Sequence, residues 1–497
     1  MDRDILLGIA FLCGTWPALG LAAEDPPLSP ASRDCLECHE EATPGVVADW
    51  RRSRHARTTV QAALAKPPAS RRVSVGEAPE GTASFAVGCA ECHTRDPDRH
   101  PDTVDHGDHR MHPVVTPADC AACHPVEADQ FRQNRMAHAH GNLVRNPLFR
   151  DLMDQAVGIR SRDGRSLKVS DPGDATRADA CLACHGTEVR VVGTVTRDTA
   201  QAGEMTFPVL SHWPNQGVGR VNPDGTLGTC SACHVRHEFS IAVARKAETC
   251  GTCHKGPDVP AYPVWSVSKH GVTVKSREAS YDFDAVPWVP GRDFTAPTCA
   301  ACHASELADA SGRVMVPRTH RFADRLAWRL FGLPYAHRPP QGPDTTGLRS
   351  ADGLPLPTAL DGTPSPGLID PAEGEARERR LATVCGACHG TSWVTGHFQK
   401  LHHVIEETNR QTRTATGMVQ EAWARGCARG PGQGSPFDEV IERRWVESWL
   451  FYGNATRFAA AMSGADYGVF AEGRWWLTKT LQAMSEWLAT CRARPSR

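Results

Sequence analysis

Long hydrophobic runs are scarce in this sequence, and hydrophobic residues account for only 40% of its 497 positions. Because a membrane-spanning helix needs roughly 20 consecutive apolar residues, the sequence predicts no transmembrane anchor. Lys and Arg form no long runs, which argues against a nucleic-acid partner. Mean hydropathy is −0.40, so aliphatic side chains alone would form a small interior for a chain of this length. We therefore expect another source of apolar surface in the core.

One short apolar stretch lies at the N-terminus, where residues 5–14 precede the small-residue sequence Leu21-Ala22-Ala23. This pattern is typical of a secretory signal peptide that is cleaved before Glu24. The stretch is too short to cross a bilayer. We therefore expect residues 1–23 to be a signal peptide and the mature protein to be soluble and periplasmic.

Cysteine and histidine, in contrast, are abundant, with 19 and 23 residues. Sixteen of the cysteines fall in eight Cys-x-x-Cys-His motifs, whereas chance predicts about 0.03 such motifs at this composition. In c-type cytochromes the two thiols bind the haem vinyl groups and the histidine binds the iron. Structural zinc sites also use Cys-x-x-Cys pairs, but they need no histidine at a fixed offset. The motifs therefore predict eight covalently bound haem c groups, whose apolar macrocycles would supply the missing interior.

The predicted thioether cysteines are Cys35, Cys38, Cys89, Cys92, Cys120, Cys123, Cys181, Cys184, Cys230, Cys233, Cys250, Cys253, Cys299, Cys302, Cys385 and Cys388. The predicted proximal iron ligands are His39, His93, His124, His185, His234, His254, His303 and His389.

A six-coordinate haem also needs a distal ligand, and 15 histidines lie outside the motifs. Their number permits bis-histidine ligation of most or all of the haems. The preferred distal candidates are His55, His112, His138, His237, His270, His320 and His397, with His140, His402 and His403 as substitutes. His100, His106, His109 and His337 lie in polar or Pro-rich segments and are expected to be solvated.

Two further cysteines, Cys427 and Cys491, remain once the motifs and Cys13 in the predicted signal peptide are set aside. In an oxidising compartment they can form a disulfide. Two free, buried thiols are the alternative.

Three regions follow from the motif positions. Residues 24–335 contain seven motifs and are expected to form a haem-dense domain of short helices and loops. Residues 336–380 are rich in Pro and Gly and are expected to form a loop. Residues 381–497 contain the eighth motif and are expected to be helical. Strand-like alternation is scarce, so the predicted fold class is mainly α, a multihaem cytochrome c fold with much irregular loop.

The C-terminal part carries a helix signal at Ser435-Pro436-Phe437-Asp438, which has the pattern of a capping box with Pro in the first turn. The spacing of Glu439, Arg443 and Glu447 supports a helix that extends to about Arg457.

The order of the motifs and several other stretches resemble the octahaem hydroxylamine oxidoreductase family, which includes hydrazine dehydrogenases and reductive octahaem enzymes. The resemblance covers most of the mature chain. Its most specific stretches are residues 181–187, 213–225, 236–240, 256–258, 268–271 and 293–299.

The resemblance implies that the fourth haem, at Cys181, Cys184 and His185, is the catalytic one with an open distal position, and that the other seven carry electrons. It also implies that Asp258 acts as a general base. In oxidative members a Tyr from a neighbouring subunit of a trimer is attached covalently to the catalytic haem, and residues 461–467 are similar to that motif. Tyr467 is thus the predicted cross-linking residue and the chain a predicted homotrimer. The alternative is a Tyr packed in a helix interface.

Two departures from the family pattern affect the functional prediction. Family members commonly have a His after this Asp, but here Val259 follows Asp258. Stretches near the C-terminus that carry His in the family are replaced by residues 449–452 and 470–473, and His212 is a possible but weaker substitute.

Three functions therefore compete. The preferred hypothesis is oxidation of a small nitrogen compound such as hydroxylamine, with electrons passing to a redox partner cytochrome or a quinone-linked acceptor. The second is reduction of nitrite or hydroxylamine to ammonia. The third is an electron-transfer cytochrome whose fourth haem has lost its pocket.

Overall fold

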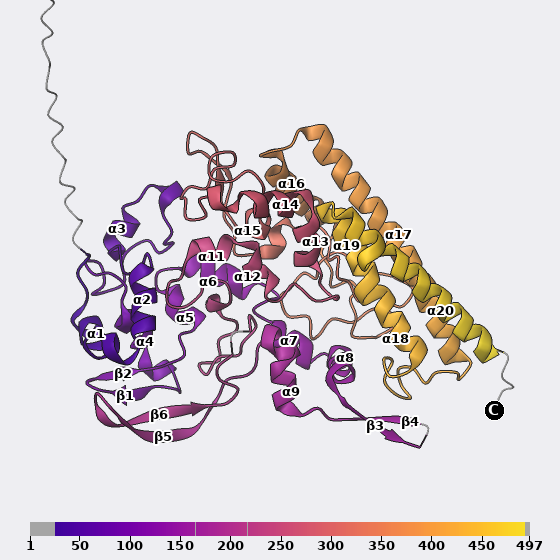
Figure 1. Cartoon of the computed structure of the whole chain (residues 1–497), viewed down its shortest axis with the longest axis horizontal. Coiled ribbons are helices and arrows are strands. Elements are labelled where there is room, and N and C mark those ends of the chain that lie inside the picture. Colours follow the sequence, from indigo (N-terminus) through magenta and orange to yellow (C-terminus); the bar gives the residue numbers. More distant parts are fainter. Residues whose placement is uncertain (1–24, 165, 216, 493–497) are drawn as a thin grey trace, which may run out of the picture.

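The computed structural model describes residues 25–164, 166–215 and 217–492 (Figure 1). The predicted signal peptide and Cys13 lie outside the described residues, as does Gln216 of the family-like stretch 213–225. Short helices and hairpins make up the first two thirds of the chain, and long helices gather at the opposite side of the molecule. The described part is therefore mainly α with much irregular loop, which confirms the predicted fold class.

The first part contains fifteen short helices within the described residues. They are α1 (Pro30–Ala42), α2 (Pro44–Arg52), α3 (Val60–Leu64), α4 (Cys89–His93), α5 (Pro117–Ala121), α6 (Pro125–Arg132), α7 (Ala139–Val144), α8 (Pro147–Val157), α9 (Gly173–Asp179), α10 (Cys181–His185), α11 (Ile241–Arg245), α12 (Ala247–Gly251), α13 (Ala261–Val267), α14 (Lys269–Arg277) and α15 (Cys299–His303). Single 3-10 turns add η1 (Pro68–Ser70), η2 (Pro97–Arg99), η3 (Cys230–Ala232), η4 (Glu278–Ser280) and η5 (Phe322–Arg325).

Local sequence explains why these helices are short. Pro occupies the first turn of α1, α2, α5, α6 and α8, where its missing N–H costs nothing. Side-chain caps begin several of them: the Asn146 side chain accepts hydrogen bonds from Leu148 N and Phe149 N at 3.0 and 3.2 Å. Helices α4, α10 and α15 consist of a Cys-x-x-Cys-His motif and no more. The motif itself is thus the local unit of structure.

Four antiparallel hairpins complete this part, which the sequence patterns did not predict. Their strands are β1 (Val104–His106) with β2 (His109–Met111), β3 (Ile159–Asp163) with β4 (Ser166–Ser170), β5 (Val191–Thr199) with β6 (Gly203–Leu210), and β7 (Leu307–Ala308) with β8 (Val314–Val316). The longest pairs Val191 with Leu210 and Thr199 with Gly203. The hairpin formed by β5 and β6 lies at the lower edge of Figure 1 beside β1 and β2.

A long loop without helix or strand follows η5 and ends at α16 (Pro371–Gly386). The loop predicted over residues 336–380 therefore begins and ends earlier than expected, because Asp370 accepts a hydrogen bond from Glu373 N at 2.8 Å and begins a helix with Pro in its first turn. The eighth motif lies at the C-terminal end of this helix.

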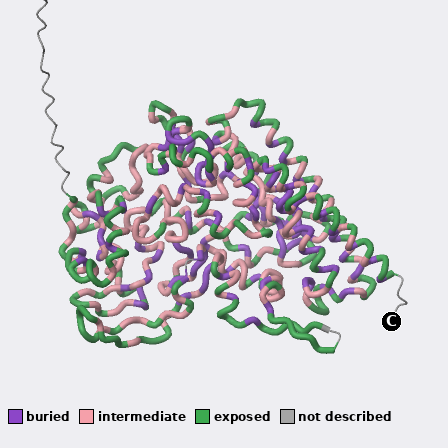
Figure 2. Tube along the Cα trace, in the orientation of Figure 1, coloured by how far each residue is buried: buried purple, intermediate pink, exposed green. Residues whose placement is uncertain are grey.

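The C-terminal part is built from α17 (Thr391–Ala424), α18 (Val440–Val446), α19 (Gly453–Met462) and α20 (Arg474–Arg492), with π-helical turns η6 (Glu447–Tyr452) and η7 (Tyr467–Ala471). Buried residues of α17, α18, η6 and α20 form one apolar cluster around Trp445, Trp449 and Met484. Figure 2 shows buried positions along these helices, whereas intermediate burial prevails in the first part of the chain. The C-terminal helices thus have an ordinary hydrophobic core.

The predicted capping box at Ser435 is wrong, because α18 begins at Val440. The Ser435 hydroxyl accepts from Phe437 N and donates to Asp151 at 2.7 Å, which fixes a turn against α8. Instead, the Glu442 carboxylate accepts from Glu439 N at 2.9 Å at the true start of the helix. The helical region then continues beyond Arg457 to Met462.

Cys427, just after α17, and Cys491 on α20 form a disulfide with Cα atoms 6.2 Å apart. This confirms the disulfide alternative. Among the described helices none is both long and apolar enough to cross a bilayer.

Candidate haem sites and active site

Four histidine pairs face one another across short gaps. The ring centroids of His39 and His106 lie 6.0 Å apart, and those of His55 and His124 lie 6.3 Å apart. The other two pairs are His234 with His320 at 6.4 Å and His270 with His389 at 6.0 Å. Two imidazoles on opposite sides of one metal, with bonds of about 2 Å each, would have centroids about 6 Å apart. These pairs therefore fit bis-histidine haems.

Each pair joins one motif histidine to one histidine from a distant segment. Of the distal candidates, His55, His270 and His320 lie in such pairs, and His237 has its ring 6.5 Å from that of His93. Their ligation remains a prediction that this geometry supports. His106 was expected to be solvated but is only half-exposed and faces His39. The hairpin of β1 and β2 places His106 opposite His39. The polar residues around His106 do not predict this contact.

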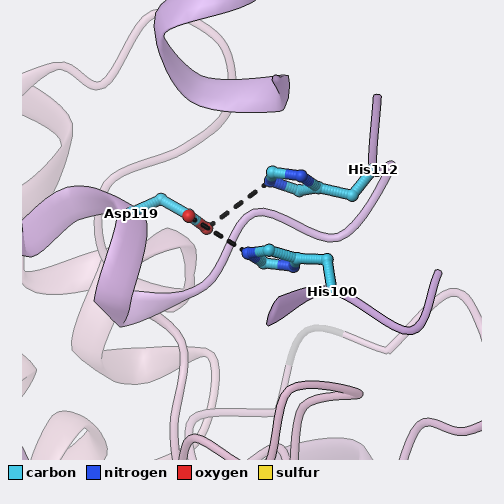
Figure 3. Close-up of side chains that lie close together, drawn as sticks. All are labelled: His100, His112 and Asp119. Atoms are coloured by element: carbon cyan, nitrogen blue, oxygen red, sulfur yellow. Dashed lines mark hydrogen bonds and ion pairs between the residues drawn. The ribbon is translucent and has the colours of Figure 1, made fainter. Parts of the chain in front are cut away.

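His112 has its ring centroid 6.2 Å from that of His93, a spacing like that of the four pairs, but its contacts differ from theirs. The His93 ring donates from Nδ1 to the backbone oxygen of His112 at 2.8 Å, so the His112 chain lies behind the ring and away from its Nε2. The His112 imidazole is itself fully buried beside His100 and Asp119 (Figure 3). Its role as a distal ligand remains a prediction, and this geometry does not favour it for the second motif.

The other candidates have protein partners. His138 donates from Nε2 to Arg132 O at 3.0 Å, which occupies the nitrogen that an iron would need. His402 pairs with Glu378 at 2.6 Å and His403 with Glu407 at 3.2 Å. The rings of His389 and His397 are both stacked on Trp393.

His140 differs from these, because it uses Nδ1, and not Nε2, to donate to Gly186 O at 2.8 Å. This bond places His140 at the fourth motif.

The fourth motif is held by the family-like stretch 213–225. Val218 N donates to Cys184 O at 3.0 Å, and the Asn215 side chain accepts from Thr187 N and Gly217 N at 3.3 and 3.0 Å. Gly186 has a φ of +89°, and a Cβ there would lie 2.3 Å from Arg220 N. Only glycine permits this approach.

Arg220 completes the support of this motif. Its guanidinium is buried and donates to Asn222 Oδ1 at 2.6 Å, to Asn215 O at 3.3 Å and to Val115 O at 3.2 Å. Burial lowers the pKa of Arg220 to about 10. Residues 213–225, which carry much of the family resemblance, therefore hold the fourth motif in place through these hydrogen bonds.

Asp258 lies beside the same motif. Burial lowers the pKa of His185, and the Asp258 carboxylate opposes this shift. The same carboxylate acts on Cys181, Cys184 and His254, so it lies within electrostatic reach of the fourth and sixth motifs. Its backbone oxygen accepts from Asn454 Nδ2 of α19 at 2.9 Å. Asp258 is thus an exposed carboxylate on a segment anchored to the C-terminal helices.

His212 does not take the place of the missing neighbour of Asp258. It is exposed, and its Nδ1 donates to Glu188 O at 3.1 Å.

Several arginines also lie near this region, and the sequence analysis did not identify them. His337 was expected to be solvated but is buried, and its Nδ1 donates to Arg338 O at 2.5 Å. Burial lowers its pKa to about 3, and Arg329, Arg135 and Arg457 reinforce the shift. Arg329 also acts on His185. Such guanidinium groups can pair with the carboxylates of haem propionates. The arginines are far apart in sequence, so no local pattern predicts that they come together.

Tyr467 lies in η7 and is half-buried, and its hydroxyl donates to Glu472 Oε2 at 2.8 Å. Burial raises the pKa of Tyr467, and the Glu472 carboxylate adds to the rise. Gly464 before it packs on α13, since a Cβ there would lie 2.9 Å from Val264. The Tyr-bearing corner thus lies against the helix that follows Asp258.

Cysteines of different motifs contact one another. The neighbouring thiols from different motifs are Cys35 with Cys89, Cys120 with Cys230, Cys184 with Cys253 and Cys250 with Cys299. Electrostatic contacts join the second motif to the third, the fifth to the sixth and the seventh to the eighth. All eight motifs therefore form one connected group, in which the fourth adjoins the sixth.

Comparison with known proteins places this geometry in a family. The family model "Cytochrome c554 and c-prime" matches residues 34–114 and 119–205, and the model "Seven times multi-haem cytochrome CxxCH" matches residues 223–325. A solved structure described as a hypothetical multiheme protein is 39% identical, with a TM-score of 0.88 over 95% of this chain and 97% of that chain.

The chain belongs to the hydroxylamine-oxidoreductase-like family of multihaem cytochromes. A curated relative of this cytochrome, a probable nitrite reductase-hydroxylamine oxidoreductase fusion protein of Kuenenia stuttgartiensis, is 24% identical over 420 residues and 81% of the chain. The cytochrome spans only 39% of that relative's length. A reducing HAO-like protein complex of the same organism shares the fold, with 20% identity and a TM-score of 0.59 over 93% of this chain and 85% of that one.

Proposed function

We propose that this cytochrome carries eight haem c groups and oxidises a small nitrogen compound, such as hydroxylamine, at its fourth motif. The observation that carries the proposal is the position of Asp258, an exposed carboxylate within electrostatic reach of His185 and His254. A haem c bound at His185 supplies the iron that accepts electrons from the substrate. Oxidation of N–H and O–H bonds also releases protons, and Asp258 is the proposed acceptor of these at its carboxylate.

The connected motifs support transfer of electrons away from this site. Cys184 of the fourth motif contacts Cys253 of the sixth, and Cys250 of the sixth contacts Cys299 of the seventh. We propose that Cys250, Cys253 and His254 of the sixth motif would hold the haem that offers the electrons a route from the fourth motif toward a redox partner cytochrome or a quinone-linked acceptor. The predicted export of the chain to the periplasm fits such a partner.

The reverse reaction, reduction of nitrite or hydroxylamine to ammonia, is the second candidate. The observation that favours it is Arg329, a half-buried cation that acts on His185, because a cation beside the iron ligand would favour an anion such as nitrite. The names of the two Kuenenia relatives also include reduction. Val259 in the place of the family His supports the third candidate, an electron-transfer cytochrome without catalysis.

A homotrimer is proposed because of Tyr467 and its surroundings. Phe470, Trp475 and Trp476 lie close to it in sequence and are exposed. Exposed aromatic side chains that gather in this way are typical of a protein interface. We propose that a second copy of the chain covers this surface and that Tyr467 reaches the partner's fourth haem.

A steady-state assay with the purified holoprotein tests the three functions. Hydroxylamine and hydrazine are offered with an oxidised electron acceptor, and nitrite is offered with a reduced donor. Turnover with hydroxylamine or hydrazine supports the oxidative proposal, and turnover with nitrite alone supports the reductive one. Reduction of the haems by dithionite without turnover in any arm would leave the electron-transfer function.

A further inference from the structure

A buried cluster of His100, His112 and Asp119 lies between the second and third motifs (Figure 3). His100 follows η2, His112 follows β2, and Asp119 belongs to α5. All three side chains are at most 8% exposed. In Figure 3 both imidazole rings point toward the Asp119 carboxylate.

The distances in the cluster suit a metal ion. His100 Nε2 lies 3.2 Å from Asp119 Oδ1, and His112 Nε2 lies 3.7 Å from Asp119 Oδ2. One ligand atom from each residue lies within 4.8 Å of the others. Tetrahedral zinc with bonds of about 2.0–2.2 Å has ligand atoms about 3.3–3.6 Å apart. The atoms thus already lie near the spacing of a metal site.

The unpaired ring of His112 indicates that a metal ion binds here. Its ring is fully buried, yet neither Nδ1 nor Nε2 has a hydrogen-bond partner among the described residues. Buried polar groups are nearly always satisfied, because an unpaired one loses its bonds to water without replacement. A metal ion between His112 Nε2 and Asp119 would satisfy this ring.

The charges around the cluster lead to the same conclusion. Asp102 is fully buried, with Oδ1 3.7 Å from His100 Nδ1 and Oδ2 accepting from Val114 N at 2.9 Å. Two buried carboxylates therefore surround His100. The rings of His100 and His112 are stacked at 3.5 Å with an angle of 4° between their planes, so two protonated rings would repel each other, and binding one ion through both rings requires one of them to turn out of this stack. A divalent cation neutralises both carboxylates without this repulsion.

Asp102 is positioned to support the metal ligand His100 from its other ring nitrogen. Metal-bound histidines usually direct their second nitrogen to a carboxylate, which fixes the ring and strengthens the ligand. His100 directs Nδ1 toward Asp102 and Nε2 toward Asp119. Asp119 is held in turn by Thr116, whose N and Oγ donate to its Oδ2 at 2.7 and 3.1 Å.

We propose that His100, His112 and Asp119 bind one divalent transition-metal ion, and zinc is the ion we test because it accepts two imidazoles and one carboxylate. The site is separate from the haems, because the His112 backbone oxygen accepts from His93 Nδ1 on the side away from Nε2. Its role is structural: it ties the loops around residues 100 and 112 to α5 and thereby fixes the orientation of the His93 ring.

The test is metal analysis of untagged holoprotein, purified without added metal. We expect native mass spectrometry to show one zinc per chain in addition to the haems, and zinc K-edge absorption to show nitrogen and oxygen ligands at about 2.0–2.1 Å. Zinc below a tenth of an atom per chain, both as purified and after incubation with zinc chloride and gel filtration, would overturn the proposal.

Variants locate the ion. His112→Gln and Asp119→Asn should lose the zinc while the haem content, measured as the pyridine haemochrome, stays unchanged. His109→Gln is the matched control, since His109 lies on the neighbouring strand and pairs with Asp34 at the surface at 3.2 Å. Zinc retained by both site variants would contradict the assignment. If these variants do not fold, the absorption spectrum of the natural chain decides alone, because a sulfur-only ligand shell would exclude this site.

Discussion

Asp258 is the carboxylate that lies beside the fourth motif. It is exposed, yet its carboxylate acts on the histidines of two motifs. Its backbone is fixed by Asn454 of α19, so the side chain has a defined position although the following residue is Val259. A single anchored carboxylate is therefore the simplest proton acceptor that this site offers.

We predict that Asp258→Asn lowers kcat for hydroxylamine oxidation by about 10²–10⁴-fold, the usual contribution of a general base. The haem spectra should not change, since the substitution is isosteric and exposed. Steady-state kinetics with a dye acceptor measure the effect. The control is Asp284→Asn, which changes an exposed carboxylate that pairs with Arg54 and should retain full activity. Equal losses in both variants would remove Asp258 from the proposed role.

Individual residues also show what the sequence could predict. The motif histidines were identified from spacing alone, because covalent haem attachment is a local requirement of the chain. Distal partners are long-range contacts, which local polarity does not predict. His106 and His337 lie in polar segments that suggest solvent exposure, but His106 faces His39 and His337 is buried. Ser435 has the local pattern of a helix cap, but its hydrogen bond to Asp151 of α8 uses the hydroxyl elsewhere. Contacts between distant segments thus overrode local signals.

Among the helices, α16 and α17 are joined by one ion pair beside the eighth motif. The Glu378 carboxylate accepts from His402 Nε2 at 2.6 Å. This hydrogen bond raises the pKa of His402 above its usual 6.5. The pair therefore stabilises the folded chain when His402 is protonated.

We predict that His402→Gln lowers the unfolding temperature at pH 5.5 but has little effect at pH 9. A raised histidine pKa contributes stability that is fully present below the unfolded pKa of 6.5 and is lost as the pH rises through the folded pKa. Because the side chain is partly exposed, the effect is about 0.2–1 kcal/mol. Thermal unfolding at both pH values measures it, with His403→Gln, an exposed neighbour, as the control. A loss of the same size at both pH values would contradict the linkage.

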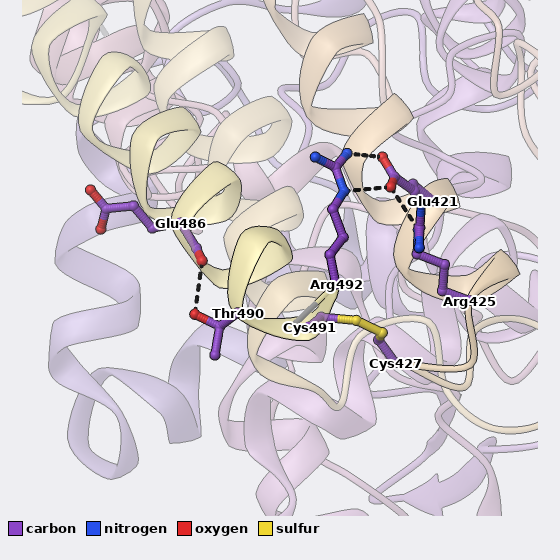
Figure 4. The surroundings of a disulfide bond; sticks show 7 residues. All are labelled: Glu421, Arg425, Cys427, Glu486, Thr490, Cys491 and Arg492. Atoms are coloured by element: carbon purple, nitrogen blue, oxygen red, sulfur yellow. Dashed lines mark hydrogen bonds and ion pairs between the residues drawn. A yellow bond between two sulfur atoms is a disulfide. The ribbon is translucent and has the colours of Figure 1, made fainter. Parts of the chain in front are cut away.

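The disulfide joins the end of α17 to the end of α20 (Figure 4). Glu421 of α17 accepts from Arg492 of α20 beside it, so a covalent bond and an ion pair hold the same two helix ends. The bond encloses α18, α19 and both π-helical turns.

We predict that replacing both cysteines by Ser lowers the stability of the C-terminal part by about 2–4 kcal/mol, because the bond restricts a long loop in the unfolded chain. Circular dichroism during thermal unfolding measures the change at the helical signal. The haem absorption should be retained, since neither cysteine belongs to a motif. An unchanged unfolding temperature would show that the hydrophobic cluster around Trp445 holds these helices without the bond.

The whole molecule divides into a motif-rich part with little ordinary core and a helical part with a normal one. Figure 2 makes this division visible. Tyr467 lies on the helical part, near exposed aromatic residues and against the helix that follows Asp258. The helical part is therefore the region through which copies of the chain would meet.

We predict that Tyr467→Phe abolishes covalent linkage between chains. Denaturing gels of the natural protein should show cross-linked species that retain haem, and mass spectrometry should find haem on the Tyr467 peptide. Tyr452→Phe, a nearby Tyr in η6, is the control and should leave the cross-link intact. Absence of any haem-bearing Tyr467 peptide in the natural protein would remove both the cross-link and its support for the oxidative function.

The thiol contacts between motifs have a consequence for biogenesis. Cys35 and Cys89, like Cys184 and Cys253, are neighbours in the folded chain. In an oxidising compartment, where a disulfide such as that between Cys427 and Cys491 persists, neighbouring thiols without haem would be oxidised to each other. We therefore expect haem attachment to come before the chain folds around its motifs, so that each thiol pair is captured while the polypeptide is still extended.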